Sequence, residues 1–140
     1  MKKVIFQTRY VQVSFDEDTK IYESEYLPET RDMTDQEWQE LMIEIRELIE
    51  TCKPHYIIDD NRNRLYSYSP DMQLWTLRLF VDSWNKIGLK KYVQIMPQEI
   101  IGKLTSEQIE EFAITNFEMH YQHKFVDDYK EAFDWVNESN

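Results

Sequence analysis

The fold is decided by residues 34–59, whose sequence is TDQEWQELMIEIRELIETCKPHYIID. Thr34 and Glu37 have the spacing of a capping box, in which each side chain accepts a hydrogen bond from the other residue's backbone N–H. Apolar side chains then recur at helical spacing, namely Trp38, Leu41, Met42, Ile45, Leu48, Ile49 and Cys52. Pro54 ends the helix, and the apolar run of residues 55–59 follows it. The segment predicts an amphipathic helix packed on a sheet, and then a central parallel strand that is covered on both faces.

Upstream of this segment, the chain has the pattern of a β-hairpin. Residues 11–15 alternate between apolar and polar side chains, which is typical of a half-buried strand. An acidic turn at residues 16–19 separates them from a second strand over residues 20–27. Residues 3–9 either extend the first strand or pair separately.

Downstream, Ser69 followed by Pro70 predicts the start of a second helix, which runs to about Lys86 and is capped by Gly88. Its apolar side chains spread over more than one face, and they include Met72, Trp75, Leu79, Phe80 and Trp84. A helix that is apolar on two sides is either deeply buried or in contact with a partner. These five residues are therefore candidates for a core, a dimer surface or the wall of an apolar pocket.

The rest of the chain continues to alternate between strands and helices. We expect a strand over residues 91–96, a helix opened by a capping box of Thr105 and Gln108, a weaker strand over 119–125, and a final helix after Asp128 that turns Ala132, Phe133 and Val136 inward. The predicted order is β-β-α-β-α-β-α-β-α. This order indicates an α/β fold with a mixed, mostly parallel sheet in a single domain of residues 1–140.

Composition and charge narrow the class of partner. The formal net charge is −11, with 27 acidic against 16 basic residues, which disfavours nucleic acids and anionic membranes. Basic residues cluster only in pairs: Lys2 with Lys3, Arg62 with Arg64, and Lys90 with Lys91. No stretch approaches a membrane span, the first residues lack the apolar run of a signal peptide, and one cysteine cannot form an intramolecular disulfide. We expect a cytoplasmic protein of bacterial type.

Motifs for catalysis or metal binding are missing from the sequence. Two glycines cannot build a phosphate loop, and neither Ser67 nor Ser69 lies in a Gly-x-Ser-x-Gly elbow. His120 and His123 are three residues apart on a predicted strand, so they point to opposite faces and share a metal ion poorly. Cys52 ends an apolar helix stripe, where thiols are usually inert. We therefore expect no enzyme, no cofactor and no metal.

A polar cluster follows the central strand. It consists of Asp59, Asp60, Asn61, Arg62 and Arg64. Ligands of open α/β sheets bind at the carboxyl ends of strands, so these residues are candidates for binding a ligand or partner, with the arginines clamping an anion. The alternative is local: Asp59 caps nearby backbone and pairs with an arginine. A catalytic use would require a substrate-sized cleft that contains Asp59 or Asp60 with a perturbed pKa.

Three stretches in this order resemble the STAS-like domain of anti-sigma factor antagonists, and in particular small stand-alone bacterial STAS-like proteins. They are VSFDEDTKI at 13–21, YIIDDNR at 56–62 and FVDDYKEAFDWV at 125–136. The resemblance covers nearly the whole chain from Val11. It implies a non-catalytic protein-interaction module, with a phosphorylated serine near the start of the second helix, where Ser67 and Ser69 lie. The Asp-Ser-Ser-Gly setting of the family is replaced here by YSYSP at 66–70.

Two functions are therefore expected from the sequence. The first is a regulatory module that binds a protein partner or a second copy of itself, through the loop of residues 59–69 and the exposed side of the second helix. The alternative is a domain that binds a small apolar ligand or lipid, by analogy with CRAL-TRIO domains, whose architecture resembles that of STAS domains. The alternative requires an apolar cavity at the second helix.

Overall fold

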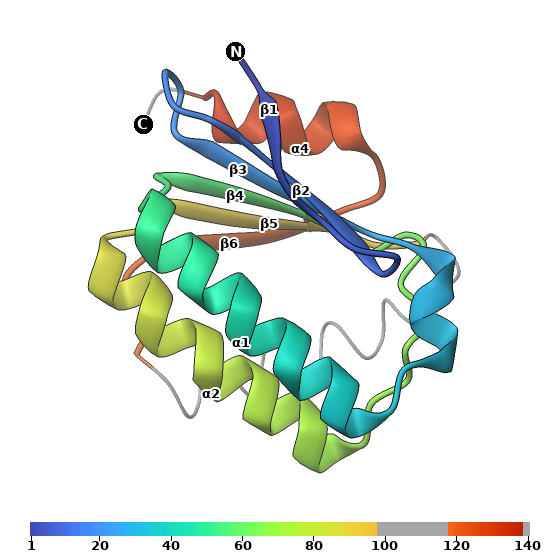
Figure 1. Cartoon of the computed structure of the whole chain (residues 1–140). Coiled ribbons are helices and arrows are strands. Elements are labelled where there is room, and N and C mark those ends of the chain that lie inside the picture. Colours follow the sequence, from blue (N-terminus) through green and yellow to red (C-terminus); the bar gives the residue numbers. More distant parts are fainter. Residues whose placement is uncertain (98–117, 139–140) are drawn as a thin grey trace.

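A central β-sheet separates two unequal layers of helix (Figure 1). The computed structural model describes residues 1–97 and 118–138. The strands are β1 (Lys3–Gln7), β2 (Val11–Asp16), β3 (Ile21–Tyr26), β4 (Tyr56–Asp60), β5 (Lys91–Ile95) and β6 (Gln122–Val126). The helices are α1 (Asp35–Cys52), α2 (Pro70–Ile87) and α4 (Tyr129–Val136), with a short 3-10 helix at Pro28–Asp32. Helices α1 and α2 cover one face of the sheet, and α4 covers part of the other. The helix predicted after Thr105 lies outside the described residues.

The strands follow one another in sequence order across the sheet, β1-β2-β3-β4-β5-β6. The pairings β1–β2 and β2–β3 are antiparallel, whereas β3–β4, β4–β5 and β5–β6 are parallel. The α/β class and the mixed character of the sheet are confirmed, but the expectation that the sheet is mostly parallel is wrong, because two of its five pairings are antiparallel. The reason is that residues 3–7 do not extend β2. They turn at Thr8, whose hydroxyl accepts a hydrogen bond from the Tyr10 N–H at 3.0 Å, and form an antiparallel edge strand.

Edge strand β1 is irregular. Its register against β2 shifts between Val4 and Phe6, so that Ile5 is an extra residue in the ladder. The side chains of Val4 and Ile5 are exposed.

Local signals in the sequence set the ends of α1 and α2. Thr34 Oγ1 accepts a hydrogen bond from the Glu37 N–H at 3.1 Å, and the Thr34 N–H donates to Glu37 Oε1 at 2.9 Å, which confirms the capping box. Ser69 caps α2 by accepting from the Met72 N–H at 3.2 Å. Gly88 ends α2 with a φ of 74°, a left-handed conformation that suits glycine.

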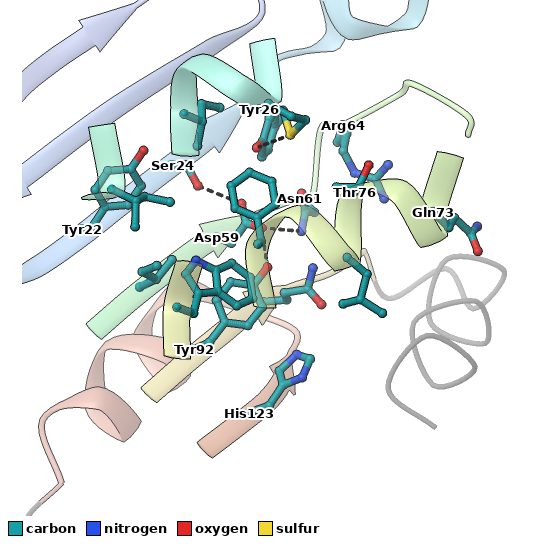
Figure 2. Close-up of a pocket in the computed structure, with 18 of the residues that line it drawn as sticks. Tyr22, Ser24, Tyr26, Asp59, Asn61, Arg64, Gln73, Thr76, Tyr92 and His123 are labelled. Carbon is teal, nitrogen blue, oxygen red and sulfur yellow. Dashed lines mark hydrogen bonds between the residues drawn. The ribbon is translucent and has the colours of Figure 1, made fainter. Parts of the chain in front are cut away.

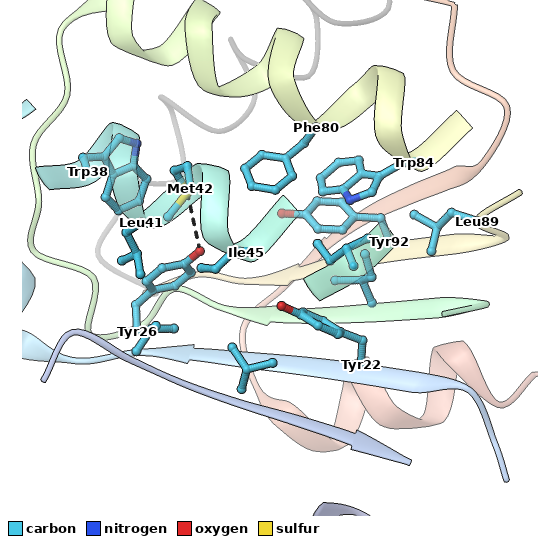
Figure 3. Packing of buried hydrophobic residues seen from close by; sticks show 14 of the residues in the cluster. Tyr22, Tyr26, Trp38, Leu41, Met42, Ile45, Phe80, Trp84, Leu89 and Tyr92 are labelled. Carbon is cyan, nitrogen blue, oxygen red and sulfur yellow. Dashed lines mark hydrogen bonds between the residues drawn. The ribbon is translucent and has the colours of Figure 1, made fainter. Parts of the chain in front are cut away.

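The larger core lies between the sheet and helices α1 and α2, and it is rich in aromatic rings (Figure 3). Trp38 and Ile45 reach it from α1, Phe80 and Trp84 from α2, and Tyr92 from β5. The ring centroids of Trp84 and Tyr92 lie 4.2 Å apart. This face of the sheet therefore carries bulky side chains with polar tips rather than an aliphatic surface alone.

The smaller core lies under α4, on the opposite face. Ala132 and Val136 are buried there, whereas Phe133, which the sequence predicts to turn inward, is 42% exposed. Lys91 lies beneath the end of α4 with only 1% of its surface exposed. Its ammonium group donates hydrogen bonds to the carbonyl oxygens of Trp135 at 2.8 Å and Glu138 at 3.1 Å. A cation at this place stabilises the carboxyl end of a helix.

Candidate functional site

A cavity of about 90 Å³ lies between the sheet and the paired helices α1 and α2 (Figure 2). Side chains from four neighbouring strands form its floor, namely Tyr22, Ser24, Asp59, Tyr92 and His123. Trp38 and Met42 of α1 and Phe80 and Trp84 of α2 close it from the other side. The site therefore brings together residues that are far apart in the sequence.

Strand register explains why these polar side chains meet. Tyr22 pairs with Ile57, Ile57 with Tyr92, and Tyr92 with His123, which makes one row across the sheet. Ser24 and Asp59 pair with each other two residues further along their strands. Side chains two residues apart on a strand point to the same face, so both rows face the helices.

Asp59 is the acidic side chain of this floor, and it is half-buried because it faces the cavity. Its carboxylate accepts hydrogen bonds from the hydroxyl groups of Tyr92 at 2.6 Å and Ser24 at 2.8 Å, and from the Asn61 amide at 3.4 Å. Desolvation raises the pKa of Asp59 above its ordinary value, although these hydrogen bonds and the charge of Arg64 act in the opposite direction. Hydrogen bonds therefore fix the position of the carboxyl, whereas burial makes its ionised form less favourable than in water.

Three buried polar atoms on the cavity wall have no hydrogen-bond partner among the described residues. They are the Tyr22 hydroxyl, the Trp84 indole N–H and His123 Nε2. Tyr22 is 1% exposed and Trp84 is 7% exposed. Burial lowers the pKa of His123 to about 4, so its imidazole is neutral near pH 7. Buried polar groups in proteins are nearly always hydrogen-bonded, so three such atoms around one cavity are unusual.

The structure divides the predicted polar cluster between the two faces of the sheet. Asp59, Asn61 and Arg64 line the cavity, whereas Asp60 and Arg62 lie on the opposite face. The division follows from the alternation of side chains at the end of β4. The Arg62 guanidinium donates to both carboxylate oxygens of Asp60, at 3.0 and 2.7 Å. The local capping and ion pairing that the sequence assigned to Asp59 therefore belong to Asp60, whose carboxylate also accepts from the Arg62 N–H at 3.1 Å.

The two arginines do not form a common anion clamp. Arg64 donates to the Tyr66 carbonyl oxygen at 3.2 Å, and its guanidinium lies 4.6 Å from the centroid of the Tyr68 ring. Arg62 is held by Asp60 on the other face of the sheet. The clamp considered from the sequence is therefore wrong.

The serines considered for phosphorylation lie outside the cavity. Ser67 and Ser69 are both exposed in the segment that leads into α2. The hydroxyl of Ser69 is occupied as the helix cap. Neither serine contacts the cavity floor, so any switch at these positions would act on the surface.

The apolar set on α2 is also divided. Phe80 and Trp84 line the cavity, and Met72 is buried in the same core. Trp75 and Leu79 lie instead in a shallow groove on the outside of the helix pair, beside charged residues such as Arg46 and Asp82. One apolar face of α2 therefore packs in the core, and the other borders solvent.

The sequence does not single out the tyrosines and the serine of the floor as site residues. Their signal was present in β3, where Tyr22, Ser24 and Tyr26 alternate along one face of a predicted strand. Tyr92 and His123 carry no comparable local signal, because only strand register brings them to Asp59. Within the described parts of the chain, no three histidine, cysteine or carboxylate side chains gather as they would around a metal ion.

No protein-family model matches the chain, and comparisons with curated proteins and with solved structures find no match either. The STAS-like resemblance therefore stays a prediction. Over residues 1–97 and 118–138, no helix has both the length and the apolar composition needed to cross a membrane.

Proposed function

We propose that the protein binds a small molecule in the cavity between the sheet and helices α1 and α2. The observation that carries the proposal is the set of unpartnered polar atoms of Tyr22, Trp84 and His123 around that cavity. Leaving a buried polar group without a hydrogen bond costs about 1–3 kcal/mol. A ligand that supplies the partners would recover part of this cost on binding.

The cavity wall also suits a small-molecule site in composition. Ligand pockets are mostly apolar and aromatic, with a few polar groups that orient the ligand. Trp38, Phe80 and Trp84 supply aromatic surface, and Asp59 and Ser24 supply polar groups. The ligand is therefore amphipathic rather than a simple lipid chain, which refines the apolar-ligand hypothesis drawn from the sequence.

The volume limits the size of the bound group. A cavity of about 150 Å³ in another protein holds a benzene molecule. The cavity here has about 90 Å³. The group that enters it is consequently smaller than a benzene ring, whether it is a whole ligand or one end of a larger one.

Native mass spectrometry of the purified protein, before and after denaturation, is the direct test. We expect a bound mass in the native spectrum that disappears on unfolding. The variant Ser24→Leu on β3 fills the cavity and should lose this mass. The variant Ser14→Leu on β2 places a leucine on the face of the sheet that points away from the cavity, and it should retain the mass. If the protein carries no molecule, a fragment screen by ¹H–¹⁵N NMR follows, and failure of every fragment to shift the Trp84 indole signal would contradict the proposal.

A protein-interaction module of the STAS-like kind is the second candidate, and the exposure of Leu65 favours it. Leu65 lies between β4 and α2, and 39% of its surface is exposed. The loop is anchored, because the Leu65 N–H donates to the buried Thr30 hydroxyl at 2.8 Å. A dimer mass in the same spectra that Leu65→Asp removes would support this function, and a monomer unaffected by the substitution would count against self-association.

Catalysis is a further outcome that the same experiments can detect. Asp59 meets one of the two conditions set for it from the sequence, because burial raises its pKa, whereas the cavity of about 90 Å³ that it lines is smaller than a substrate-sized cleft. Turnover of the released molecule, lost in Asp59→Asn, would assign Asp59 as a general acid or base. Without turnover, the same features serve binding.

A further inference from the structure

We infer that the bound group is a small organic cation, an ammonium group, and that Asp59 is the residue that binds it. The inference rests on the proposed function, because it names the chemistry of the ligand that the cavity takes. Four features of the described residues lead to it.

The first feature is the charge of the floor. Asp59 is the one carboxylate among the described residues that line the cavity. Within that part of the chain, no lysine or arginine nitrogen forms an ion pair with it. The donors from Tyr92, Ser24 and Asn61 are neutral. A carboxylate with neutral partners can gain a charge-assisted hydrogen bond from a bound ammonium group.

The second feature is Arg64, the arginine on the cavity wall. It is already engaged, because it donates to the Tyr66 carbonyl and lies over the rings of Tyr68 and Trp38, with distances of 4.6 and 5.9 Å to their centroids. It therefore lacks the free bidentate geometry with which arginine recognises a carboxylate or phosphate ligand. An anionic ligand would also bring a second negative charge close to Asp59.

The third feature is the aromatic wall. Aromatic side chains from α1, α2 and two strands surround the cavity, namely Tyr22, Tyr26, Trp38, Phe80, Trp84 and Tyr92. The faces of such rings attract organic cations, and the attraction grows when water is excluded. The combination of one carboxylate with several rings is therefore better matched to an ammonium group than to a neutral group of the same size.

The fourth feature is the field of the whole molecule. A net charge of −11 draws cations toward the surface and repels anions. The orphaned Trp84 indole can only donate, so it additionally favours a ligand that carries a hydrogen-bond acceptor such as a hydroxyl or carbonyl oxygen.

The test uses three probes with one two-carbon skeleton: ethylamine, ethanol and acetate. They are charged positive, neutral and negative at pH 7, and each is smaller than benzene. Affinities are measured on the full chain by ¹H–¹⁵N NMR titration, with the Trp84 indole signal as the reporter. We expect ethylamine to bind about tenfold more tightly than ethanol, a ratio typical of a hydrogen bond to a charged group. Acetate should bind least.

Variants assign the preference to Asp59. In Asp59→Asn, the affinity for ethylamine should fall to that for ethanol, and the affinity for ethanol should change by less than about twofold. Asp60→Asn, on the other face of the sheet, should leave all three affinities unchanged. If Asp59→Asn does not fold, Asp59→Ser replaces it and should likewise remove the preference for the amine, because it too removes the charge.

The outcomes separate the inference from the proposed function. Equal affinities, or tightest binding of acetate, would overturn the inference while leaving small-molecule binding intact. A preference for the amine that persists in Asp59→Asn would overturn the assignment of Asp59. The absence of a saturable shift with any of the three probes would contradict the proposed function itself.

Discussion

The Asp59 carboxyl lies where burial makes its ionised form unfavourable. It faces the cavity from the end of β4, and burial raises its pKa. Between the unfolded and the folded pKa, the folded protein binds more protons than the unfolded chain. The stability contributed by this residue is therefore present at low pH and is lost as the pH rises through the folded pKa.

Replacing Asp59 by asparagine should consequently stabilise the protein at pH 7. Asparagine keeps the size of the side chain and one oxygen acceptor but removes the desolvated charge, so we expect a gain of about 1 kcal/mol in the free energy of unfolding. Urea denaturation at pH 7 and at pH 3.5 measures it, and the gain should shrink at the lower pH. Asp60→Asn, which breaks an exposed ion pair, should instead cost less than about 1 kcal/mol. A loss of stability in Asp59→Asn that is greater at pH 7 would show that the carboxylate supports the fold.

Two tyrosines in one row of the sheet offer a matched comparison. The Tyr92 hydroxyl donates to Asp59 at 2.6 Å, whereas the Tyr22 hydroxyl has no partner among the described residues. Tyr92→Phe should therefore destabilise the protein by about 1–3 kcal/mol, and Tyr22→Phe should be neutral or slightly stabilising. Thermal unfolding of both variants in parallel measures the difference. Equal losses would indicate that the Tyr22 hydroxyl has a partner after all.

At the scale of elements, the sequence predicts helices well and pairings poorly. The ends of α1 and α2 follow from Thr34, Ser69 and Gly88, because caps act on backbone within a few residues. The separate pairing of residues 3–7 could not be predicted, because nothing local distinguishes an extended strand from a returning one. The site could likewise be predicted only in part, because strand pairing is not visible in local sequence. The position of Asp59 at the end of its strand could be anticipated, whereas Tyr92 and His123 lie near Asp59 only because of the strand register across the sheet.

One buried lysine anchors the carboxyl end of helix α4 to the sheet. The Lys91 ammonium group donates to the carbonyl oxygens of Trp135 and Glu138, and it lies 5.1 Å from the centroid of the Trp135 ring. Lys91→Met should cost about 1–3 kcal/mol, because two carbonyl groups lose a charged donor. Hydrogen exchange should show the loss of protection concentrated in α4. Lys90→Met, at the exposed neighbouring position, should change stability by less than about 0.5 kcal/mol. Uniform loss of protection across the sheet would argue against a local attachment.

On the scale of the whole molecule, the two cores differ in the polarity of their side chains. The core under α4 is largely aliphatic, whereas the core under α1 and α2 contains the cavity, the carboxyl of Asp59 and the orphaned polar atoms. A core that retains unsatisfied polar groups is less stable than an apolar one of the same volume. We therefore expect that the α1–α2 side limits the stability of the fold.

Protonation of His123, which lies on the α1–α2 side of the sheet, should make the free energy of unfolding depend on pH. Its folded pKa of about 4 lies below the ordinary value of 6.5. The neutral imidazole therefore contributes stability that is fully present above pH 6.5 and is lost as the pH falls toward 4, by at most about 3 kcal/mol. Urea denaturation across pH 4–7 should give a flatter profile for His123→Gln than for the unchanged protein. His120→Gln, at a more open position on the chain before β6, serves as the control, and identical profiles for both variants would contradict the assignment to His123.

The irregular first strand bears on how separate copies of the molecule behave in concentrated solution. An apolar edge strand with a regular row of unpaired N–H and C=O groups is a template for aggregation into fibrils. Residues 3–7 read KVIFQ, and Val4 and Ile5 are exposed on that edge. The register shift at Ile5 breaks the regular spacing that a second strand would need, and Lys2 and Lys3 bring like charges together when two such edges approach. We therefore expect the bulge in β1 to disfavour growth of the protein, strand on strand, into a fibril.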